Sequence, residues 1–177
     1  VSAACERLGL TVLVVGEGRE RLRLEALAGA NVTLLGRQSQ AQVETLMARC
    51  RAFVYAGLED FGIAPVEAMA AGAPVIGLGR GGLLDTVRCA AAGCSQPTGV
   101  LFHDQSVESV VQAVEWFQQQ QRLKPFSSDS IRLWAERFRP EAFSARFEAS
   151  MRRSWAGHQM RCAVAASDPA KVPGLFS

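Results

Sequence analysis

Short apolar runs alternate with helical patterns over residues 10–120 of the chain. The apolar runs predict strands, and the first of them has the unbroken apolar pattern of a strand that is buried on both faces. The predicted strands are LTVLVV (10–15), NVTLLG (31–36), AFVYAG (52–57), PVIGLG (74–79) and VLF (100–102). This alternation predicts a doubly wound, Rossmann-like α/β domain with a parallel sheet and helices on both faces.

Polar residues mark the starts of the helices between these strands. Residues 39–50 and 106–120 predict helices with Ser39 and Ser106 as N-caps. GEGRERLRLEALAGA predicts a turn and a helix, and GGLLDTV predicts a short helix.

The helix after AFVYAG has clear signals at both ends. It should begin near Gly62, because Pro65 is tolerated in a first turn and no further in. Gly72 is a natural stop, and Pro74 shows that the helix cannot continue.

Beyond Pro125 the strand pattern ends, and two helices broken at Pro140 are expected. Aromatic side chains are the expected packing anchors of this region: Trp134, Phe138, Phe143, Phe147 and Trp155. Residues 156–177 show no periodicity and predict a poorly ordered tail, which leaves residues 1–155 as the domain.

The composition is that of an ordinary globular protein. Of 177 residues, 49% are apolar and 20% charged, and the net charge of +2 gives no reason to expect nucleic acid as a partner. No apolar run reaches a membrane span and no signal peptide is evident, so a cytoplasmic location is expected. Cys89 and Cys94 have no histidine nearby, so free thiols are the better interpretation than a metal site.

Three loops follow predicted strands and carry the candidate chemistry: GEG (16–18), EDFG (59–62) and GRGGLLD (79–85). Parallel sheets bind ligands outside the carboxyl ends of their strands, so these loops should meet at one edge. Glycines let backbone amides approach a phosphate, although a lone Gly-x-Gly is weak evidence.

Two glutamates flank the start of the central helix. Glu59 lies in the loop after AFVYAG, and Glu67 lies about one turn inside the helix. Carboxylates accept hydrogen bonds from vicinal hydroxyls, so this edge has the character of a nucleotide-sugar site. The alternative is that both are solvated charges. We expect Glu67 to need a partner, because a bare carboxylate between buried strands is costly.

The segments VVGEG, NVTLLGR, AFVYAGLEDFGIAPVEAMAAGAPVIGLGRGGLLDTV and PTGVLFHDQSVESVVQAVEWF resemble the C-terminal domain of retaining GT-B glycosyltransferases. This family includes glycogen-synthase-like and bacterial polysaccharide enzymes, and Glu59 and Glu67 match its Glu-x7-Glu motif over a resemblance of residues 10–150. EDFGIAPVEAMAAG, GRGG and QSVES most resemble bacterial O-antigen and exopolysaccharide mannosyltransferases, which implies GDP-mannose as the donor.

The resemblance implies a role for each candidate residue. Glu59 would be catalytic, close to the transferred sugar, and Glu67 would hold the ribose hydroxyls of the donor. The other donor-binding residues would be Gly16, Glu17 and Gly18 in the nucleotide pocket, Arg37 by the base, Phe61, Gly62 and Ile63 by the sugar, and Gly81, Gly82, Leu83 and Leu84 by the pyrophosphate or sugar. The family implies no metal and no other cofactor, with the departing diphosphate acting as base and its stabilisation as the main catalytic task.

The chain also departs from the family. Relatives carry a strand, an Arg and a Lys that clamp the diphosphate upstream of the strand matched by LTVLVV, and an N-terminal domain that binds the glycan or lipid-linked acceptor. Neither is found in this sequence. We therefore expect a fragment that folds but transfers no sugar alone. Arg80 is either a substitute cation or an exposed loop arginine, and His103 is expected to be structural or exposed.

Two expectations concern partners: a homodimer through apolar surface at residues 140–155, and peripheral attachment of the longer enzyme to the cytoplasmic face of a membrane. Three other functions stay open. An NAD-dependent oxidoreductase should show a third glycine that GEG lacks. A non-catalytic binding or regulatory domain is disfavoured by the intact glutamates, and a GT-B epimerase would need catalytic groups from another domain.

Overall fold

The computed structural model describes residues 1–90 and 94–167, apart from the side chains of residues 164–167. The chain forms two compact units, Val1–Glu136 and Arg137–Ser177. The first unit contains all the described strands and carries the candidate site. The second consists largely of one long helix.

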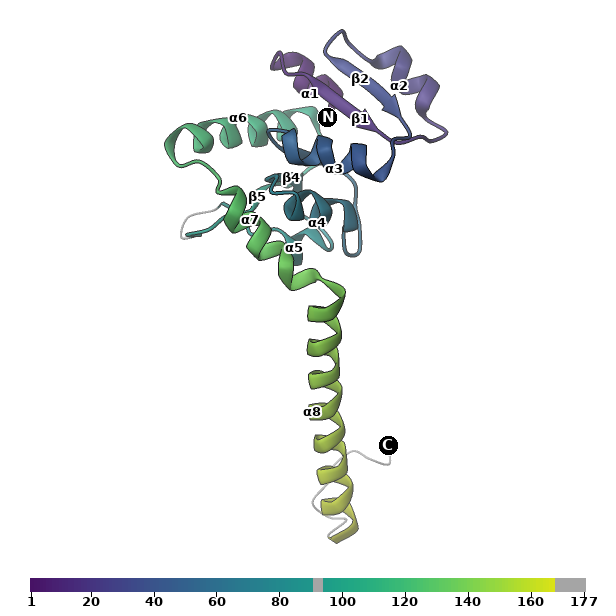
Figure 1. The fold of residues 1–177 in the computed structure, drawn as a ribbon, viewed down its shortest axis with the longest axis vertical. Helices are drawn as coiled ribbons and strands as arrows, with labels where there is room; N and C mark the ends of the chain where they lie inside the picture. The colour runs from purple at the N-terminus through teal and green to yellow at the C-terminus, as the bar shows by residue number, and fades with distance from the viewer. Residues whose placement is uncertain (91–93, 168–177) are drawn as a thin grey trace. The chain divides into compact units, whose positions relative to one another are not determined.

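The first unit has the predicted alternation of parallel strands and helices (Figure 1). Every described strand pair is parallel. Four of the strands fall within predicted runs, and β5 begins one residue before the predicted run 100–102. The strands are β1 (Val12–Val15), β2 (Val32–Gly36), β3 (Phe53–Tyr55), β4 (Val75–Leu78) and β5 (Gly99–Phe102). The helices are α1 (Ser2–Arg7), α2 (Arg21–Leu27), α3 (Gln40–Arg49), α4 (Ile63–Ala70), α5 (Leu83–Thr86), α6 (Val107–Leu123) and α7 (Ser128–Ala135). The predicted α/β fold class is confirmed.

The strands form two sheets where the sequence predicted one. β1 pairs with β2, and β3, β4 and β5 form the other sheet in that order. A cavity of about 910 Å³ is lined by β1 and β3 and by residues of α1, α3 and α6. Neighbouring strands must lie about 4.8 Å apart to share hydrogen bonds. The open space at the facing edges of β1 and β3 accounts for the division.

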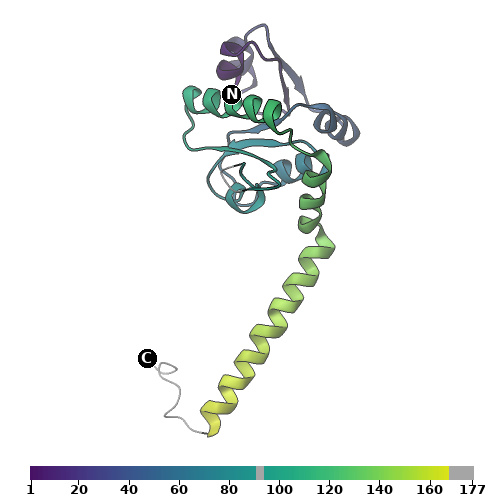
Figure 2. The ribbon, with the colours of Figure 1, turned by 90° about the vertical axis from the view of Figure 1, so that its left-hand side faces the viewer.

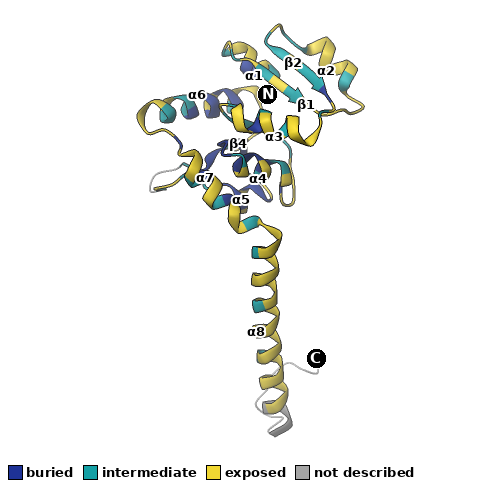
Figure 3. Cartoon of the chain, viewed as in Figure 1, coloured by how far each residue is buried: buried dark blue, intermediate teal, exposed yellow. Residues whose placement is uncertain are grey.

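The same cavity corrects the prediction that the first strand is buried on both faces. Leu13 and Val15 of β1 are 50% and 40% exposed, whereas every residue of β4 is buried (Figure 3). A strand is buried on both faces only if helices cover both sides of a continuous sheet. β4 meets that condition in the three-stranded sheet, and β1 in the two-stranded sheet does not.

The core surrounds β4. It includes Ile76 and Leu78 of β4 itself, Met69 of α4, and Val114 and Phe117 of α6. α1 packs beside α6 (Figures 1 and 2), and α4 packs against α7. α1 was not predicted from the sequence. The short segment of six residues buries only Ala4 and Cys5, so its pattern is too brief to stand out.

The predicted helix caps of α3 and α6 are confirmed. Ser39 Oγ accepts a hydrogen bond from the Gln42 amide, and the Gln42 side chain accepts one from the Ser39 amide, which makes a capping box at α3. Ser106 Oγ accepts a hydrogen bond from the Ser109 amide at the start of α6.

α4 begins and ends where glycine chemistry requires. Gly62 is its N-cap with φ of +83°, and Gly72 follows its end with φ of +91°, both in the left-handed region. The amides of Gly72 and Ala73 donate to the carbonyls of Met69 and Ala68, the hydrogen-bond pattern of a Schellman motif. The predicted start and stop of this helix are therefore confirmed.

The second unit is dominated by α8 (Pro140–Ser167), which begins at the proline where a helix break was predicted. Three of the predicted packing anchors, Phe143, Phe147 and Trp155, are 55–62% exposed, so they do not anchor a core within this unit. Residues 156–167 continue the helix where a tail was expected, and residues 168–177 lie outside the described residues. None of the described helices combines the length and the hydropathy that a membrane span requires.

Candidate functional site

The loops that leave β3 and β4 are in direct backbone contact. The Gly82 amide donates a hydrogen bond to the Glu59 carbonyl at 2.8 Å. A Cβ at Gly81 would overlap the Glu59 carbonyl oxygen, and a Cβ at Gly82 would overlap Phe61 Cα. The loops EDFG and GRGG therefore meet as predicted, and the glycines are what permit this approach.

Glu59 is held by a tyrosine that the sequence analysis did not single out. Tyr55, the last residue of β3, donates its hydroxyl to Glu59 Oε1. Desolvation first, and then the hydrogen bond to the Glu59 carboxylate and its charge, raise the pKa of Tyr55 to about 12. Tyr55 thus stays a neutral donor at physiological pH and holds an exposed carboxylate at the carboxyl end of the strand.

Glu67 lies in the second turn of α4 and is exposed. It forms no ion pair with the residues that the structure describes. The expectation that a buried Glu67 must have a partner is therefore wrong, because water solvates the carboxylate. Its exposure leaves it accessible to a ligand.

Exposed apolar side chains occur on the two contacting loops and at the start of α4. Phe61 is 46% exposed and Ile63 is 67% exposed, one on each side of the buried N-cap Gly62. Leu84 is 61% exposed, whereas Leu83 is fully buried. Exposed apolar surface next to a carboxylate suits a ligand with both apolar and hydroxyl-bearing faces.

Leu83 and the following turn fix the second loop. A Cβ at Gly62 would lie 3.0 Å from Leu83 Cδ1, so the leucine side chain packs directly on the start of α4. The Leu84 amide donates to the Gly81 carbonyl at 3.1 Å. The amides of Gly82 and Leu84 therefore hold the loops, while the side chain of Leu83 belongs to the core.

The third predicted loop lies at the end of the two-stranded sheet. The Gly16 amide donates to the Gly36 carbonyl at 2.9 Å, so GEG leaves β1 beside the end of β2. Glu17, Gly18 and the neighbouring Arg37 are all exposed. The structure thus places GEG and Arg37 together at the carboxyl edge of β1 and β2.

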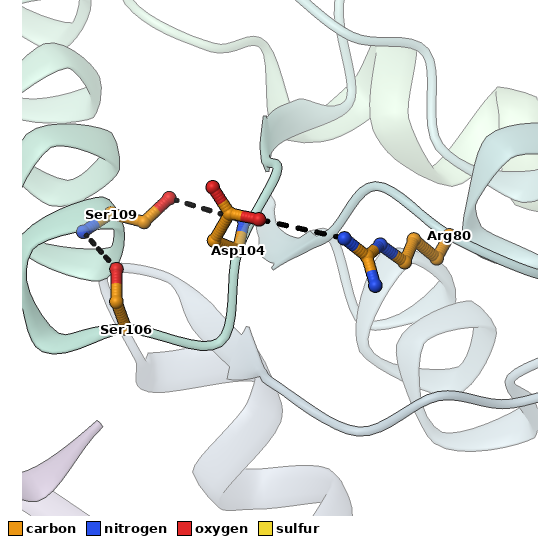
Figure 4. Close-up of polar contacts among 4 residues, drawn as sticks. All are labelled: Arg80, Asp104, Ser106 and Ser109. Atoms are coloured by element: carbon orange, nitrogen blue, oxygen red, sulfur yellow. Dashed lines mark hydrogen bonds and ion pairs between the residues drawn. The ribbon is translucent and has the colours of Figure 1, made fainter.

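The loop after β5 joins the three-stranded edge, although the sequence analysis assigned it no role. Gln105 donates its side-chain amide to the Ala56 carbonyl at 2.7 Å. Arg80 Nη2 lies 3.5 Å from Asp104 Oδ1 (Figure 4). His103 is exposed, in agreement with its expected role. Position alone could have identified Asp104 and Gln105, because they directly follow a strand of the same parallel sheet.

The cysteines stand apart from this edge. The five cysteines are free, which agrees with their interpretation as thiols, and burial raises the pKa of Cys5 and Cys50. Within residues 1–90 and 94–167, no group of three or more His, Cys, Asp or Glu side chains is arranged to hold a metal ion.

Comparison with known proteins decides the family. The family described as "Glycosyl transferases group 1" matches residues 3–128, well over half of the chain. The chain belongs to this family. The group 1 match spans both sheets and all the loops of the candidate site. No curated protein sequence matches the chain.

Solved glycosyltransferase structures share the fold. Sucrose-phosphate synthase from Thermosynechococcus elongatus has a TM-score of 0.62 and 20% identity, with 89% of this chain and 49% of that one covered. Anabaena Alr3699/HepE in complex with UDP and glucose has a TM-score of 0.61 and 20% identity, with 86% and 42% covered. The pneumococcal O-GlcNAc transferase GtfA in complex with UDP and GlcNAc has a TM-score of 0.64 and 18% identity, with 86% and 31% covered.

These likenesses show that this group 1 chain has the α/β fold found in one half of GT-B glycosyltransferases. The chain spans half or less of the length of each of those structures. The resemblance of the sequence to a GT-B glycosyltransferase is thus confirmed at the level of family and fold.

Proposed function

We propose that this chain is the donor-binding part of a retaining glycosyltransferase that transfers a hexose to a glycan or a lipid-linked acceptor in polysaccharide biosynthesis. The observation that carries the proposal is the contact between Glu59 and Gly82. It joins the backbone of Glu59, whose carboxylate accepts a hydrogen bond from Tyr55, to a glycine-rich turn at the edge where parallel sheets bind ligands.

Glu59 contributes an acceptor for the hydroxyls of the transferred sugar. Its carboxylate is exposed, while Tyr55 restricts its orientation through the hydrogen bond to Oε1. A positioned acceptor recognises a hydroxyl pattern better than a mobile one, because less conformational entropy is lost on binding. Phe61 and Ile63 add apolar surface against which the face of a sugar ring can pack.

Glu67 contributes acceptors for the ribose hydroxyls of the nucleotide. Its place in the second turn of α4 keeps it in the helix that starts at Gly62, directly after the Glu59 loop. The two glutamates therefore lie on one continuous loop-and-helix segment, in which the left-handed Gly62 forms the entry into α4. Gly16, Glu17, Gly18 and Arg37 would border the nucleotide from the edge of the two-stranded sheet.

GDP-mannose is the donor that we propose first. Its support is the resemblance of EDFGIAPVEAMAAG, GRGG and QSVES to bacterial mannosyltransferases. UDP-glucose is the main competitor, since Alr3699/HepE was solved with UDP-glucose. No metal is required by this proposal, because retaining members of the family rely on protein groups to stabilise the departing diphosphate.

The proposal places the acceptor-binding site outside the residues of this chain. We propose that an N-terminal domain binds the acceptor, that the enzyme works in the cytoplasm at the membrane face, and that this chain alone binds donor without transferring sugar. The half-length match to glycosyltransferase structures supports this division of labour.

The decisive experiment is isothermal titration of GDP-mannose, GDP, UDP-glucose, UDP and NAD into this chain. It is repeated with Glu67→Ala and with Glu115→Ala as the matched control, because Glu115 is an exposed glutamate on a different helix, α6. Circular dichroism spectra establish that each variant is folded.

Saturable binding of one nucleotide family, lost in Glu67→Ala and kept in Glu115→Ala, is the expected result. Binding of NAD in preference to the nucleotide sugars would replace the proposal with an oxidoreductase. A folded chain that binds none of the five ligands would mean that this part does not form a donor site by itself.

A further inference from the structure

Arg80 lies in a tight turn at the carboxyl end of β4. The Gly79 amide donates a hydrogen bond to the Phe102 carbonyl of β5 at 2.7 Å, and the Arg80 amide donates one to the Leu78 carbonyl at 2.8 Å. This three-residue turn reverses the chain as soon as it leaves the sheet. The Arg80 side chain is therefore presented at the edge and is 61% exposed.

The backbone around Arg80 leads directly to the glutamate loop. Gly81 has a φ of +60°, and any Cβ there would overlap the Glu59 carbonyl oxygen. Gly82 donates to the same carbonyl. Arg80 is thus one residue away from the contact between the two loops.

Asp104 supplies the counter-charge from the loop after β5. Its Oδ1 lies 3.5 Å from Arg80 Nη2, and its backbone amide donates to Ser109 Oγ at 3.4 Å in the first turn of α6 (Figure 4). Ser106 caps that turn. The neighbouring Gln105 ties the same loop to the end of β3 through Ala56. Asp104 therefore has a supported backbone, while Arg80 reaches across to it.

The ion pair itself is weak. Both side chains are more than 60% exposed, and 3.5 Å is longer than the 2.7–2.9 Å that is usual for a charge-assisted hydrogen bond. Exposed pairs of this kind contribute little to stability. A stronger anion can replace the carboxylate at little cost, and phosphate oxygens match the planar guanidinium in a bidentate manner.

We propose that Arg80 binds the diphosphate of the donor, and that Asp104 is an exposed counter-ion that pairs with the guanidinium until the diphosphate displaces it. This inference rests on the proposed function. It assigns the cation of the site to the loop after β4, which contacts the backbone of Glu59.

The test compares a nucleoside with its diphosphate. Guanosine and GDP, or uridine and UDP if the uracil nucleotides bind, are titrated into the chain and into Arg80→Gln, Arg80→Lys and Asp104→Asn. Arg122→Gln is the control, an exposed arginine in the last turn of α6. Thermal unfolding by circular dichroism verifies the fold of each variant. If Arg80→Gln does not fold, Arg80→Lys takes its place as the test of Arg80.

Arg80→Gln should weaken diphosphate binding by about ten-fold or more and leave nucleoside binding unchanged, because only the phosphates lose a charged donor. Arg80→Lys should retain part of the affinity, and Asp104→Asn should strengthen diphosphate binding by up to about five-fold, since an exposed competing anion is removed. Arg122→Gln should have no effect.

The outcomes separate this inference from the proposed function. Suppose that Glu67→Ala abolishes nucleotide binding. If Arg80→Gln then leaves the affinities for nucleoside and diphosphate unchanged, or lowers both equally, the role of Arg80 is refuted and the donor site stands. A weaker diphosphate affinity in Asp104→Asn refutes the displacement of Asp104. If the folded wild-type chain binds no nucleotide, the donor site in this chain and the role of Arg80 fail together.

Discussion

The amide nitrogen of Gly82 lies 2.8 Å from the carbonyl oxygen of Glu59, and this hydrogen bond joins the loops that follow β3 and β4. It makes the position of one candidate residue depend on the backbone of another loop. Stability and binding should therefore change together when this contact is disturbed.

Gly82→Ala should lower both the stability of the chain and its affinity for nucleotide. The φ of Gly82 is −62°, so the added methyl meets no conformational penalty, but it would overlap Phe61 Cα and lie 2.5 Å from the Asp60 carbonyl oxygen. Backbone atoms cannot move aside cheaply, and we expect a loss of roughly 1–3 kcal/mol in the free energy of unfolding. Urea unfolding followed by circular dichroism measures the loss, and titration with nucleotide should show weaker binding.

Gly157→Ala is the control for this substitution. Its added methyl would meet no described atom closer than 3.5 Å, and it lies inside α8 in the second unit. Alanine favours a helix over glycine, so this variant should not be destabilised. Equal unfolding free energies for Gly82→Ala and wild type would show that the two loops do not pack as described.

Tyr55 should titrate at unusually high pH. It is the only tyrosine of the chain, so tyrosinate absorbance near 295 nm reports this residue alone. The pKa of about 12 lies above the ordinary 10.0, so the folded state favours the neutral phenol. The stability that Tyr55 contributes is complete below pH 10 and is lost as the pH rises through 12. A native midpoint equal to that of the denatured chain would contradict this.

Glu59→Gln should lower the pKa of Tyr55 but not restore its ordinary value. The substitution removes the charge that opposes ionisation and weakens the hydrogen bond, while the largest cause, desolvation, remains. The absorbance titration of this variant should therefore have a midpoint between 10 and 12. An unchanged midpoint would mean that Glu59 does not bind the tyrosine.

Trp134→Phe should loosen α7. The indole Nε1 donates to the carbonyl of the buried Thr86 at 2.7 Å, and phenylalanine has no donor to replace it. An unsatisfied buried carbonyl costs about 1–3 kcal/mol in the free energy of unfolding. Chemical unfolding should show that loss, whereas Trp116→Phe, at a half-buried position in α6, should lose less. Equal losses would show that the hydrogen bond contributes nothing specific.

Amide hydrogen exchange should be faster in the two-stranded sheet than in the three-stranded sheet. β4 lies in the centre of a three-stranded sheet and every residue is buried, whereas β1 pairs on one side only and alternates between half-buried and exposed residues. Two-stranded sheets are marginal in water. Peptides covering β1 and β2 should exchange well before those covering β4, and equal protection would show that the cavity between the sheets is closed in solution.

The sequence predicted every strand that the structure describes, because short apolar runs bounded by turn residues and alternating with helical patterns favour strands. It also predicted both ends of α4, since Gly62 and Gly72 adopt left-handed conformations that other residues rarely reach. Local chemistry decides such features. The family resemblance follows from the same segments, since its motif residues lie at the ends of those strands.

Tertiary structure alone decided how these elements meet. Nothing in LTVLVV reveals that β1 would lack a partner on one edge, because burial depends on strands elsewhere in the chain. The hydrogen bond from Tyr55 to Glu59 spans four residues, yet it depends on how the loop after β3 folds against Gly82. The Arg80–Asp104 pair joins two loops 24 residues apart. The sequence by itself therefore determined the elements and the candidate residues, and packing between distant segments decided the sheet division, the exposure of Glu67 and the contacts among the loops.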